Sequence, residues 1–162
     1  MKSLLVVVVA VIVNSEAAVP TGESCEIKSA AFSDYLYLSA GWVSQNPILW
    51  PVRPQLASRR KMHGKWRIEA KENRGKTFYR LWNHGAETFL VAKGDGVGTR
   101  KTSGGKDSDL LWKIEALGAS EGATLSQDGE FLVAKEDKAG EERELKMGPR
   151  SNKKSAKWVI NC

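Results

Sequence analysis

Lys65-Trp66-Arg67-Ile68-Glu69-Ala70 is the stretch that decides the fold, because the chain repeats this phrase twice more. The second copy is Leu111-Trp112-Lys113-Ile114-Glu115-Ala116, and the third is Lys157-Trp158-Val159-Ile160-Asn161-Cys162. The tryptophans of successive copies lie 46 residues apart. A fixed period of this size predicts one structural unit copied three times along the chain.

Three other short phrases recur in each period, and their aromatic and β-branched residues are typical of strands. One phrase, upstream of each repeated tryptophan or of its counterpart, is Asp34–Ser39, Thr88–Lys93 and Glu130–Lys135. Before it come Cys25–Lys28, Thr77–Trp82 and Ala123–Ser126, and after it Ile48–Trp50, Gly98–Lys101 and Leu145–Met147. Four short strands in three units predict an all-β barrel with pseudo-threefold symmetry and about twelve strands. The pattern resembles a β-trefoil, with repeats at approximately 25–70, 71–116 and 117–162.

The repeated Trp-x-Ile phrase predicts a shared core rather than a ligand site. Indole and isoleucine two residues apart lie on one face of a strand, and large aromatics bury much apolar area. We therefore expect Trp66, Trp112 and Trp158 inside the barrel.

The N-terminus has the layout of a secretory signal peptide. Lys2 precedes an apolar run over 4–13, and the small residues Ala17 and Ala18 follow. That run is too short to span a bilayer, which needs about 20 apolar residues. We expect residues 1–18 to be removed and residues 19–162 to form a single secreted, extracellular domain with no membrane insertion.

Two cysteines, Cys25 and Cys162, stand near the ends of the mature chain. Export places them where disulfides persist, so we predict that they pair. The first and last strands of a β-trefoil are neighbours, which would bring the two cysteines together. No N-glycosylation sequon is present.

Composition and spacing give little support for an enzyme or a bound cofactor. His63 and His84 are the only histidines, and neither has a companion at metal-ligand or triad spacing. The glycine-rich stretch 94–105 lacks the residues of a phosphate-binding loop. We therefore expect a binding protein without catalytic residues, metal or cofactor.

The segment Asn46-Pro47-Ile48-Leu49-Trp50-Pro51, followed by Trp66-Arg67-Ile68, resembles one unit of the ricin-type lectin trefoils. In that family the Leu-Trp-Pro aromatic stacks on a sugar, which implies that Trp50 is a stacking platform. The implied polar contacts are Ser39, Gln45, Asn46 and Arg53. The family's Gln is replaced by Gly64, Leu110 and Ala156, and its Asp by Ser39, Lys93 and Lys135. Only the first unit keeps the aromatic, so we expect at most one such site.

The whole layout of signal peptide, small basic domain, six tryptophans and two cysteines looks like the cysteine- and tryptophan-rich salivary proteins of Culex mosquitoes. The resemblance implies a saliva protein of a blood-feeding insect that acts in the vertebrate host. It also implies a β-trefoil fold and carbohydrate binding.

A formal net charge of +6 favours anionic partners such as sulfated glycans. Two basic clusters precede final strands: Arg59-Arg60-Lys61 with Lys65, and Arg150 with Lys153, Lys154 and Lys157. The second cluster resembles, in position, the heparin-binding loop of fibroblast growth factor trefoils, where cations meet sulfates. Nucleic acid is not an expected partner of an exported protein.

The sequence thus predicts a monomeric, lectin-like protein that binds host carbohydrate, with sulfated-glycan binding through Arg150, Lys153, Lys154 and Lys157 as the alternative. A third possibility is a protease or haemostasis inhibitor that acts through a loop between strands over 70–77. Lys71, Arg74 and Lys76 would then face trypsin-like enzymes. Lys93-Gly94-Asp95 also matches an integrin-binding tripeptide of disintegrins.

Overall fold

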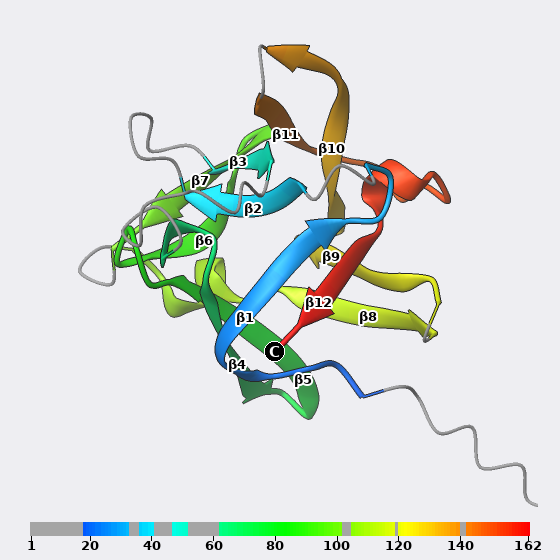
Figure 1. Ribbon diagram of the computed structural model, residues 1–162. Helices are drawn as coiled ribbons and strands as arrows, with labels where there is room; N and C mark the ends of the chain where they lie inside the picture. Colours follow the sequence, from blue (N-terminus) through cyan, green and yellow to red (C-terminus); the bar gives the residue numbers. More distant parts are fainter. Residues whose placement is uncertain are drawn as a thin grey trace, which may run out of the picture.

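A computed structural model gives the fold (Figure 1). It describes residues 18–32, 36–40, 47–51, 62–101, 105–118, 120–139 and 142–162, with the backbone alone for 36–40, 47–51, 138–139 and 142. The predicted signal peptide thus lies almost wholly outside the described residues.

Twelve strands and two short 3-10 turns make up the described part of the chain. The strands are β1 Gly22–Ser29, β2 Leu36–Ala40, β3 Pro47–Pro51, β4 Trp66–Asn73, β5 Lys76–Asn83, β6 Thr88–Lys93, β7 Gly96–Arg100, β8 Lys113–Gly118, β9 Gly122–Gln127, β10 Glu130–Ala139, β11 Glu142–Gly148 and β12 Trp158–Asn161. The 3-10 turns are η1 Asp107–Leu110 and η2 Lys154–Ala156. Each unit therefore holds the four strands that its recurring phrases predict. The expected boundaries at 70/71 and 116/117 fall inside β4 and β8.

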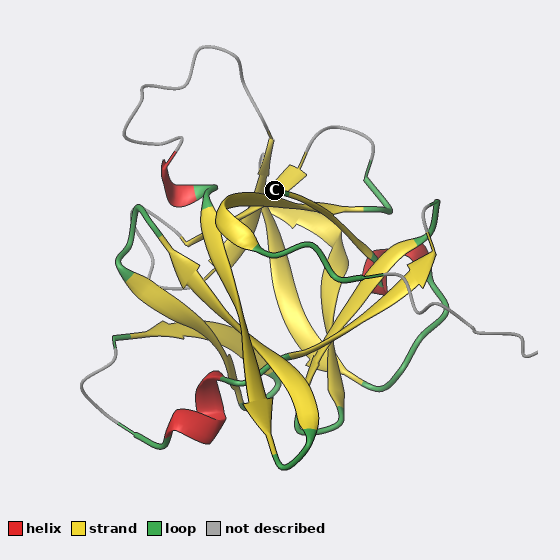
Figure 2. Cartoon of the chain, turned by 90° about the horizontal axis from the view of Figure 1, so that it is seen from below, coloured by secondary structure: helices red, strands yellow, loops and turns green. Residues whose placement is uncertain are grey.

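Six strands form a ring of antiparallel pairs, and this ring is the barrel seen from one end in Figure 2. β1 pairs with β4, β4 with β5, β8 with β9, β9 with β12, and β12 with β1. A bridge between Tyr79 and Trp112 joins β5 to β8, with both backbone hydrogen bonds at 2.8 Å. The predicted all-β trefoil barrel is confirmed.

The other six strands form three hairpins, one in each unit: β2–β3, β6–β7 and β10–β11. Each hairpin joins the barrel strand that precedes it, through β1–β2, β5–β6 and β9–β10. The hairpins of units one and three also pair with each other, because β11 lies beside β3.

The three repeated tryptophans are fully buried, with 0% of their surface exposed. Trp112 and Trp158 also make the same hydrogen bond: Nε1 donates to the carbonyl of Leu90 at 2.9 Å and of Leu132 at 3.0 Å. Leu90 and Leu132 occupy the same place in the recurring hairpin phrase. The prediction that these tryptophans build a shared core is confirmed.

A buried polar side chain lies opposite each repeated tryptophan, and the sequence pattern did not reveal it. Ser29 pairs with Trp158, Asn83 with Trp66, and Gln127 takes the matching place opposite Trp112. The Asn83 amide donates to the His63 carbonyl at 2.7 Å and accepts from two backbone N–H groups. The Gln127 amide accepts from Ala92 N–H and donates to the Asp109 and Leu111 carbonyls. These amides satisfy backbone groups that burial would otherwise leave unpaired.

Cys25 and Cys162 form a disulfide with an S–S distance of 2.07 Å across 137 residues of sequence, as predicted. Its position follows from the register, because the pairing of β1 with β12 places the end of β12 beside the buried Cys25. The bond closes the barrel where its first and last strands meet.

Candidate functional site

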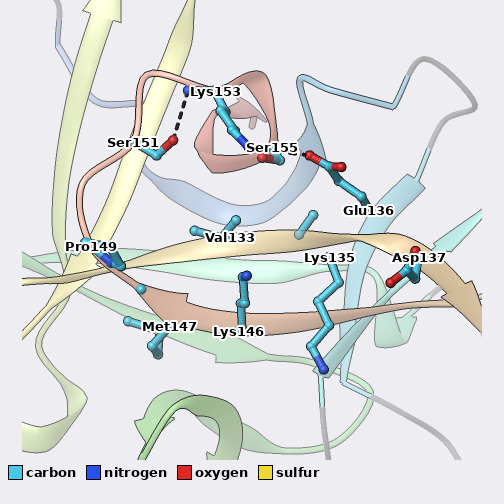
Figure 3. Close-up of a pocket in the computed structure, with 12 residues that line it drawn as sticks. Val133, Lys135, Glu136, Asp137, Lys146, Met147, Pro149, Ser151, Lys153 and Ser155 are labelled. Atoms are coloured by element: carbon cyan, nitrogen blue, oxygen red, sulfur yellow. Dashed lines mark hydrogen bonds and ion pairs between the residues drawn. The ribbon is translucent and has the colours of Figure 1, made fainter.

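One candidate site is a cavity of about 510 Å³ on unit three, between the β10–β11 hairpin and the loop that leads to β12 (Figure 3). We call it the third-unit groove. Its lining residues are Val133, Ala134, Lys135, Glu136, Asp137, Lys146, Met147, Gly148, Pro149, Ser151, Lys153 and Ser155.

The floor of the groove is the outward face of the hairpin. Leu145 and Met147 of β11 are buried in the core, whereas Lys146, between them, is exposed. This alternation follows from the pleat of a strand. A Cβ atom added at Gly148 would have no heavy atom within 4 Å. The groove is therefore open at Gly148 because this residue has no side chain.

A bulge in β10 builds the far wall. The pairing of β10 with β11 shifts register between Ala134 and Lys138, and such bulges redirect side chains. Arg143, only 8% exposed, donates from Nη1 to the carbonyls of Lys135 and Glu136. Its guanidinium also lies 3.6 Å from the ring centroid of Phe32. Arg143 thus holds the bulge that presents Glu136 and Asp137.

The near wall is the loop from Pro149 to η2. The Ser151 hydroxyl accepts a hydrogen bond from Lys153 N–H at 3.1 Å, and Ala156 N–H donates to the Lys153 carbonyl at 3.1 Å. The guanidinium of Arg150 lies 5.9 Å from the centroid of the Phe131 ring. Local hydrogen bonds and the buried Ala156 fix this loop against the barrel.

The charges of the groove are mixed. The Lys135 ammonium donates to Glu144 at 2.6 Å, which raises the pKa of Lys135 and lowers the pKa of Glu144. Lys153 lies 3.9 Å from Glu136, and both side chains are three-quarters exposed, so this pair contributes little to stability. Among the described residues, no side chain forms an ion pair or hydrogen bond with Lys146 or with the Asp137 carboxylate.

Lys146 and Lys135 extend in opposite directions across the two strands in Figure 3. Lys146 reaches from β11 toward β10 and the groove, whereas Lys135 crosses the hairpin to the other side, where it meets Glu144. Lys146 is therefore the free cation of the floor.

The ladder register relates this groove to the strand that carries Trp50. Trp50 pairs with Tyr37 in unit one, Gly98 with Val91 in unit two, and Lys146 with Val133 in unit three. Tyr37, Val91 and Val133 are the same position of the recurring hairpin phrase. Lys146 therefore stands at the position of the lectin-like aromatic.

The corresponding space in unit two is filled. Arg100 pairs with Phe89, as Gly148 pairs with Phe131. Its guanidinium donates to Asp109 at 2.9 Å and to the Lys106 carbonyl at 2.8 Å, and it passes close to Gly105. The hydrogen bond and charge of Arg100 lower the pKa of Asp109. Arg100 thus joins the hairpin to the η1 loop, and its side chain occupies the place that Gly148 leaves without a side chain in unit three.

The lectin-like residues predicted in unit one are only partly described. Ser39 lies in β2 opposite Ile48, and Trp50 lies in β3 opposite Tyr37, as strand residues of one hairpin. Gln45, Asn46 and Arg53 lie outside the described residues, as does the basic run 59–61.

The basic cluster predicted in unit three lies beside the groove. Arg150, Lys153 and Lys154 are exposed. Lys157 is instead paired with Glu121 at 2.7 Å, and its side chain is 19% exposed. Lys65, at the matching place before Trp66, is likewise paired, with Glu26 at 2.8 Å. Three exposed cations therefore remain on this loop.

The segment 70–77, expected as a loop of an inhibitor, is instead a tight hairpin. Residues 70–73 pair with 76–79, and only Arg74 and Gly75 form the turn. Both have positive φ, 51° and 72°, as the favoured two-residue hairpin turns require. Lys71 and Lys76 therefore lie in paired strands, and Arg74 stands at the tip.

The tripeptide Lys93-Gly94-Asp95 forms the exposed turn between β6 and β7. The Asp95 carbonyl accepts a hydrogen bond from Met147 N–H at 2.9 Å, which fixes the turn to β11. Whether this tripeptide contacts an integrin stays a prediction.

The groove residues that sequence reasoning missed are Asp137, Lys146 and Gly148. Lys146 was seen only as a strand residue, and Asp137 and Gly148 carried no motif. The signal is the strand pairing: Trp50 pairs with Tyr37 and Lys146 with Val133, and Tyr37 and Val133 are equivalent positions. Lys146 is therefore the counterpart of Trp50.

Other parts of the described chain show little chemistry. No group of three histidine, cysteine, aspartate or glutamate side chains within the described ranges could hold a metal ion. Over the same ranges, no helix has the length and apolar character needed to cross a membrane.

No protein-family model and no curated protein sequence matches the chain. Solved structures match it in fold. A designed threefold-symmetric protein, ThreeFoil, aligns with a TM-score of 0.67 at 16% identity, over 87% of this chain and 99% of its own. An arabinofuranosidase complexed with arabinofuranosyl-alpha-1,2-xylobiose aligns with a TM-score of 0.71 at 11% identity, over 91% of this chain and 32% of its own. A mosquitocidal holotoxin aligns with a TM-score of 0.68 at 15% identity, over 91% of this chain and 18% of its own. At these identities the likeness establishes the fold: the chain is a β-trefoil.

Proposed function

We propose that the chain is a secreted, monomeric, non-catalytic β-trefoil module that binds carbohydrate. The observation that carries this proposal is the open groove on the outward face of the β10–β11 hairpin, beside exposed cations. The arabinofuranosidase that shares the fold was solved in complex with arabinofuranosyl-alpha-1,2-xylobiose, which fits such a role. The resemblance to Culex salivary proteins favours a host glycan as the partner.

A binding role suits the groove better than hydrolysis does. Glycoside hydrolysis needs two carboxylates that flank the scissile bond. Glu136 and Asp137 are instead consecutive residues of β10, on one wall. Lys153 lies 3.9 Å from Glu136, and Lys146 lies on the floor of the groove. A pair of cations can bind an acidic group but supplies no second carboxylate.

The exposed loop cations favour the sulfated-glycan form of the proposal. Arg150, Lys153 and Lys154 present guanidinium and ammonium groups that suit sulfates. Lys157 is paired with Glu121, so it contributes little net charge to this surface. The alternative neutral-sugar site depends on Trp50, with Ser39, Gln45, Asn46 and Arg53 around it.

A glycan array at two ionic strengths tests the proposal. Binding through the loop should be lost on raising salt from about 0.1 M to about 1 M, because the Debye length falls from about 10 Å to about 3 Å. The variant Arg150→Gln/Lys153→Gln/Lys154→Gln should lose it too, and Trp50→Ala should keep it. Binding that survives high salt and is lost in Trp50→Ala would assign the neutral-sugar site. A chain that binds no glycan at either salt concentration would overturn the proposal.

A further inference from the structure

We infer that the third-unit groove recognises one acidic sugar residue, with Lys146 bound to its anionic group and Asp137 bound to its hydroxyls. The inference rests on the proposed function, and it names the ligand class and the residues that select it. The shared chemistry is a polyhydroxylated ring that carries a carboxylate or a sulfate.

The first step is the free cation at the centre of the floor. Lys146 is exposed and reaches into the groove from β11. Lys135 is neutralised by Glu144 and Lys153 is near Glu136, whereas Lys146 has no partner among the described side chains. An anion that enters the groove therefore meets Lys146 without displacing an existing ion pair.

The second step is the acceptor on the opposite wall. The Asp137 carboxylate lines the groove beside the β10 bulge that Arg143 supports. It has no hydrogen-bond donor among the described residues, and its charge acts on Lys135. An ionised carboxylate only accepts hydrogen bonds. It would repel a bare anion but bind hydroxyl donors, so Lys146 on the floor and Asp137 on the far wall together select a ligand with both kinds of group.

The third step is access. A Cβ atom added at Gly148 would meet no other atom within 4 Å, and Gly148 does not have the positive φ that would require glycine. The same position in unit two is Arg100, whose side chain fills the corresponding space. Gly148 is therefore the residue that keeps the third-unit groove open.

The variant Gly148→Arg distinguishes binding inside the groove from binding driven by net charge alone. The substitution adds a positive charge, so binding driven by net charge alone should become tighter. If the sugar occupies the groove, the arginine should fill its place, and affinity should fall about tenfold or more, as for loss of a hydrogen bond to a charged group.

The full disulfide-bonded chain would be titrated by calorimetry with four probes. These are a tetrasaccharide containing unsulfated glucuronate, its O-sulfated counterpart, a neutral tetrasaccharide of N-acetyllactosamine, and inorganic sulfate. The two acidic tetrasaccharides identify whether a carboxylate suffices or a sulfate is needed. The neutral tetrasaccharide and inorganic sulfate should both bind at least tenfold more weakly than the better acidic tetrasaccharide, because each lacks one of the two recognised groups.

Two further variants keep the test independent of the folding of Gly148→Arg. Lys146→Met should weaken the acidic tetrasaccharide about tenfold, whereas Lys101→Met, which removes an exposed lysine from the end of β7, should change affinity less than about twofold. Asp137→Asn should weaken the tetrasaccharide but strengthen or preserve binding of inorganic sulfate.

The inference is overturned if Lys146→Met and Lys101→Met lose affinity equally, or if Gly148→Arg binds the acidic tetrasaccharides as tightly as the parent. It is also overturned if inorganic sulfate binds as well as the tetrasaccharides. In each of these results glycan binding on the array still stands, so the proposed function survives. The absence of all glycan binding overturns both.

Discussion

Units two and three have the same backbone plan but differ in what lies between hairpin and loop. In both units a buried tryptophan donates from Nε1 to the carbonyl of an equivalent hairpin leucine. On the outer face, Arg100 of unit two is bonded to Asp109 and Lys106, whereas unit three has Gly148 and an open groove. The inward residues have kept the threefold pattern, and the outward residues have lost it.

The difference shows which positions of a symmetric fold can vary to form a binding site. An inward side chain is fixed by the dense packing of the barrel, where changes in volume are costly. An exposed residue such as Lys146 does not take part in that packing, so it can change with little effect on the core. A binding site in this fold therefore needs a change in one unit only.

The largest expected effect tests whether the cores of the two units are equivalent. Trp112→Ala and Trp158→Ala should each lower the free energy of unfolding by about 3 to 5 kcal/mol, since each removes a fully buried indole and a buried hydrogen bond. Urea denaturation followed by circular dichroism, with the disulfide intact, measures both. The surface variant Val159→Ala, at a 39% exposed position next to Trp158, is the control.

Equal losses within about 1 kcal/mol would support equivalent cores, because cavity costs at chemically identical sites vary by more than that when packing differs. If one substitution lowers the free energy of unfolding by less than half as much as the other, the cores of the two units are not equivalent. The groove would then belong to a unit that differs throughout, not only on its surface.

The next effect concerns the arginines of the two hairpins. Arg143→Met should cost about 1.5 to 3 kcal/mol, because it removes a charged donor from the partly buried carbonyls of Lys135 and Glu136. Arg100→Met should cost about 1 kcal/mol or less, because its partner Asp109 is half exposed. Thermal unfolding of both variants checks the order.

Arg143→Met should also weaken binding of an acidic tetrasaccharide, since the bulge that carries Asp137 loses its support. Arg100→Met should leave that affinity unchanged. An Arg143→Met protein that binds as tightly as the parent would show that the bulge does not depend on Arg143. The far wall of the groove would then need another explanation.

The sequence was sufficient to predict the fold because the decisive signal is periodic and faces inward. Trp66, Trp112 and Trp158 recur at one interval, and burial in a common core requires the same residue type in each unit. The disulfide was predictable for a related reason, because the trefoil places its first and last strands together. Both predictions rest on symmetry, which a single sequence displays directly.

The groove could not be predicted in the same way, because it arises where symmetry is broken. Gly148 and Lys146 belong to no sequence motif. Their equivalence to Arg100 and Trp50 becomes visible only from their strand partners, Phe131 and Val133. The bulge that presents Asp137 depends on Arg143, a residue that reads in sequence as one more surface cation. Similarly, Lys157 was predicted as a free cation, but a contact with Glu121, 36 residues away, pairs it.

The smallest effect tests the ion pairs that precede the final strands. Units one and three each have a paired lysine before the tryptophan, Lys65 with Glu26 and Lys157 with Glu121, whereas unit two has Leu111. The hydrogen bond from Lys65 lowers the pKa of Glu26 below its ordinary value of 4.5, with Lys28 adding to the effect against partial burial. The folded state therefore favours the ionised carboxylate.

Because the pKa of Glu26 is lower in the folded chain than in the unfolded chain, its contribution is complete above about pH 4.5 and disappears as the pH falls through the folded value. Glu26→Gln should lower the free energy of unfolding at pH 7 by about 0.5 kcal/mol, since the pair is one-third exposed. As the pH falls toward 2 and the carboxyl becomes protonated, the variant and the parent should unfold increasingly alike. Glu130→Gln, an exposed glutamate outside any described ion pair, should match the parent at both pH values. A difference between Glu26→Gln and the parent that persists near pH 2 would mean that Glu26 acts through packing, and the ion pair would then not distinguish unit one from unit two.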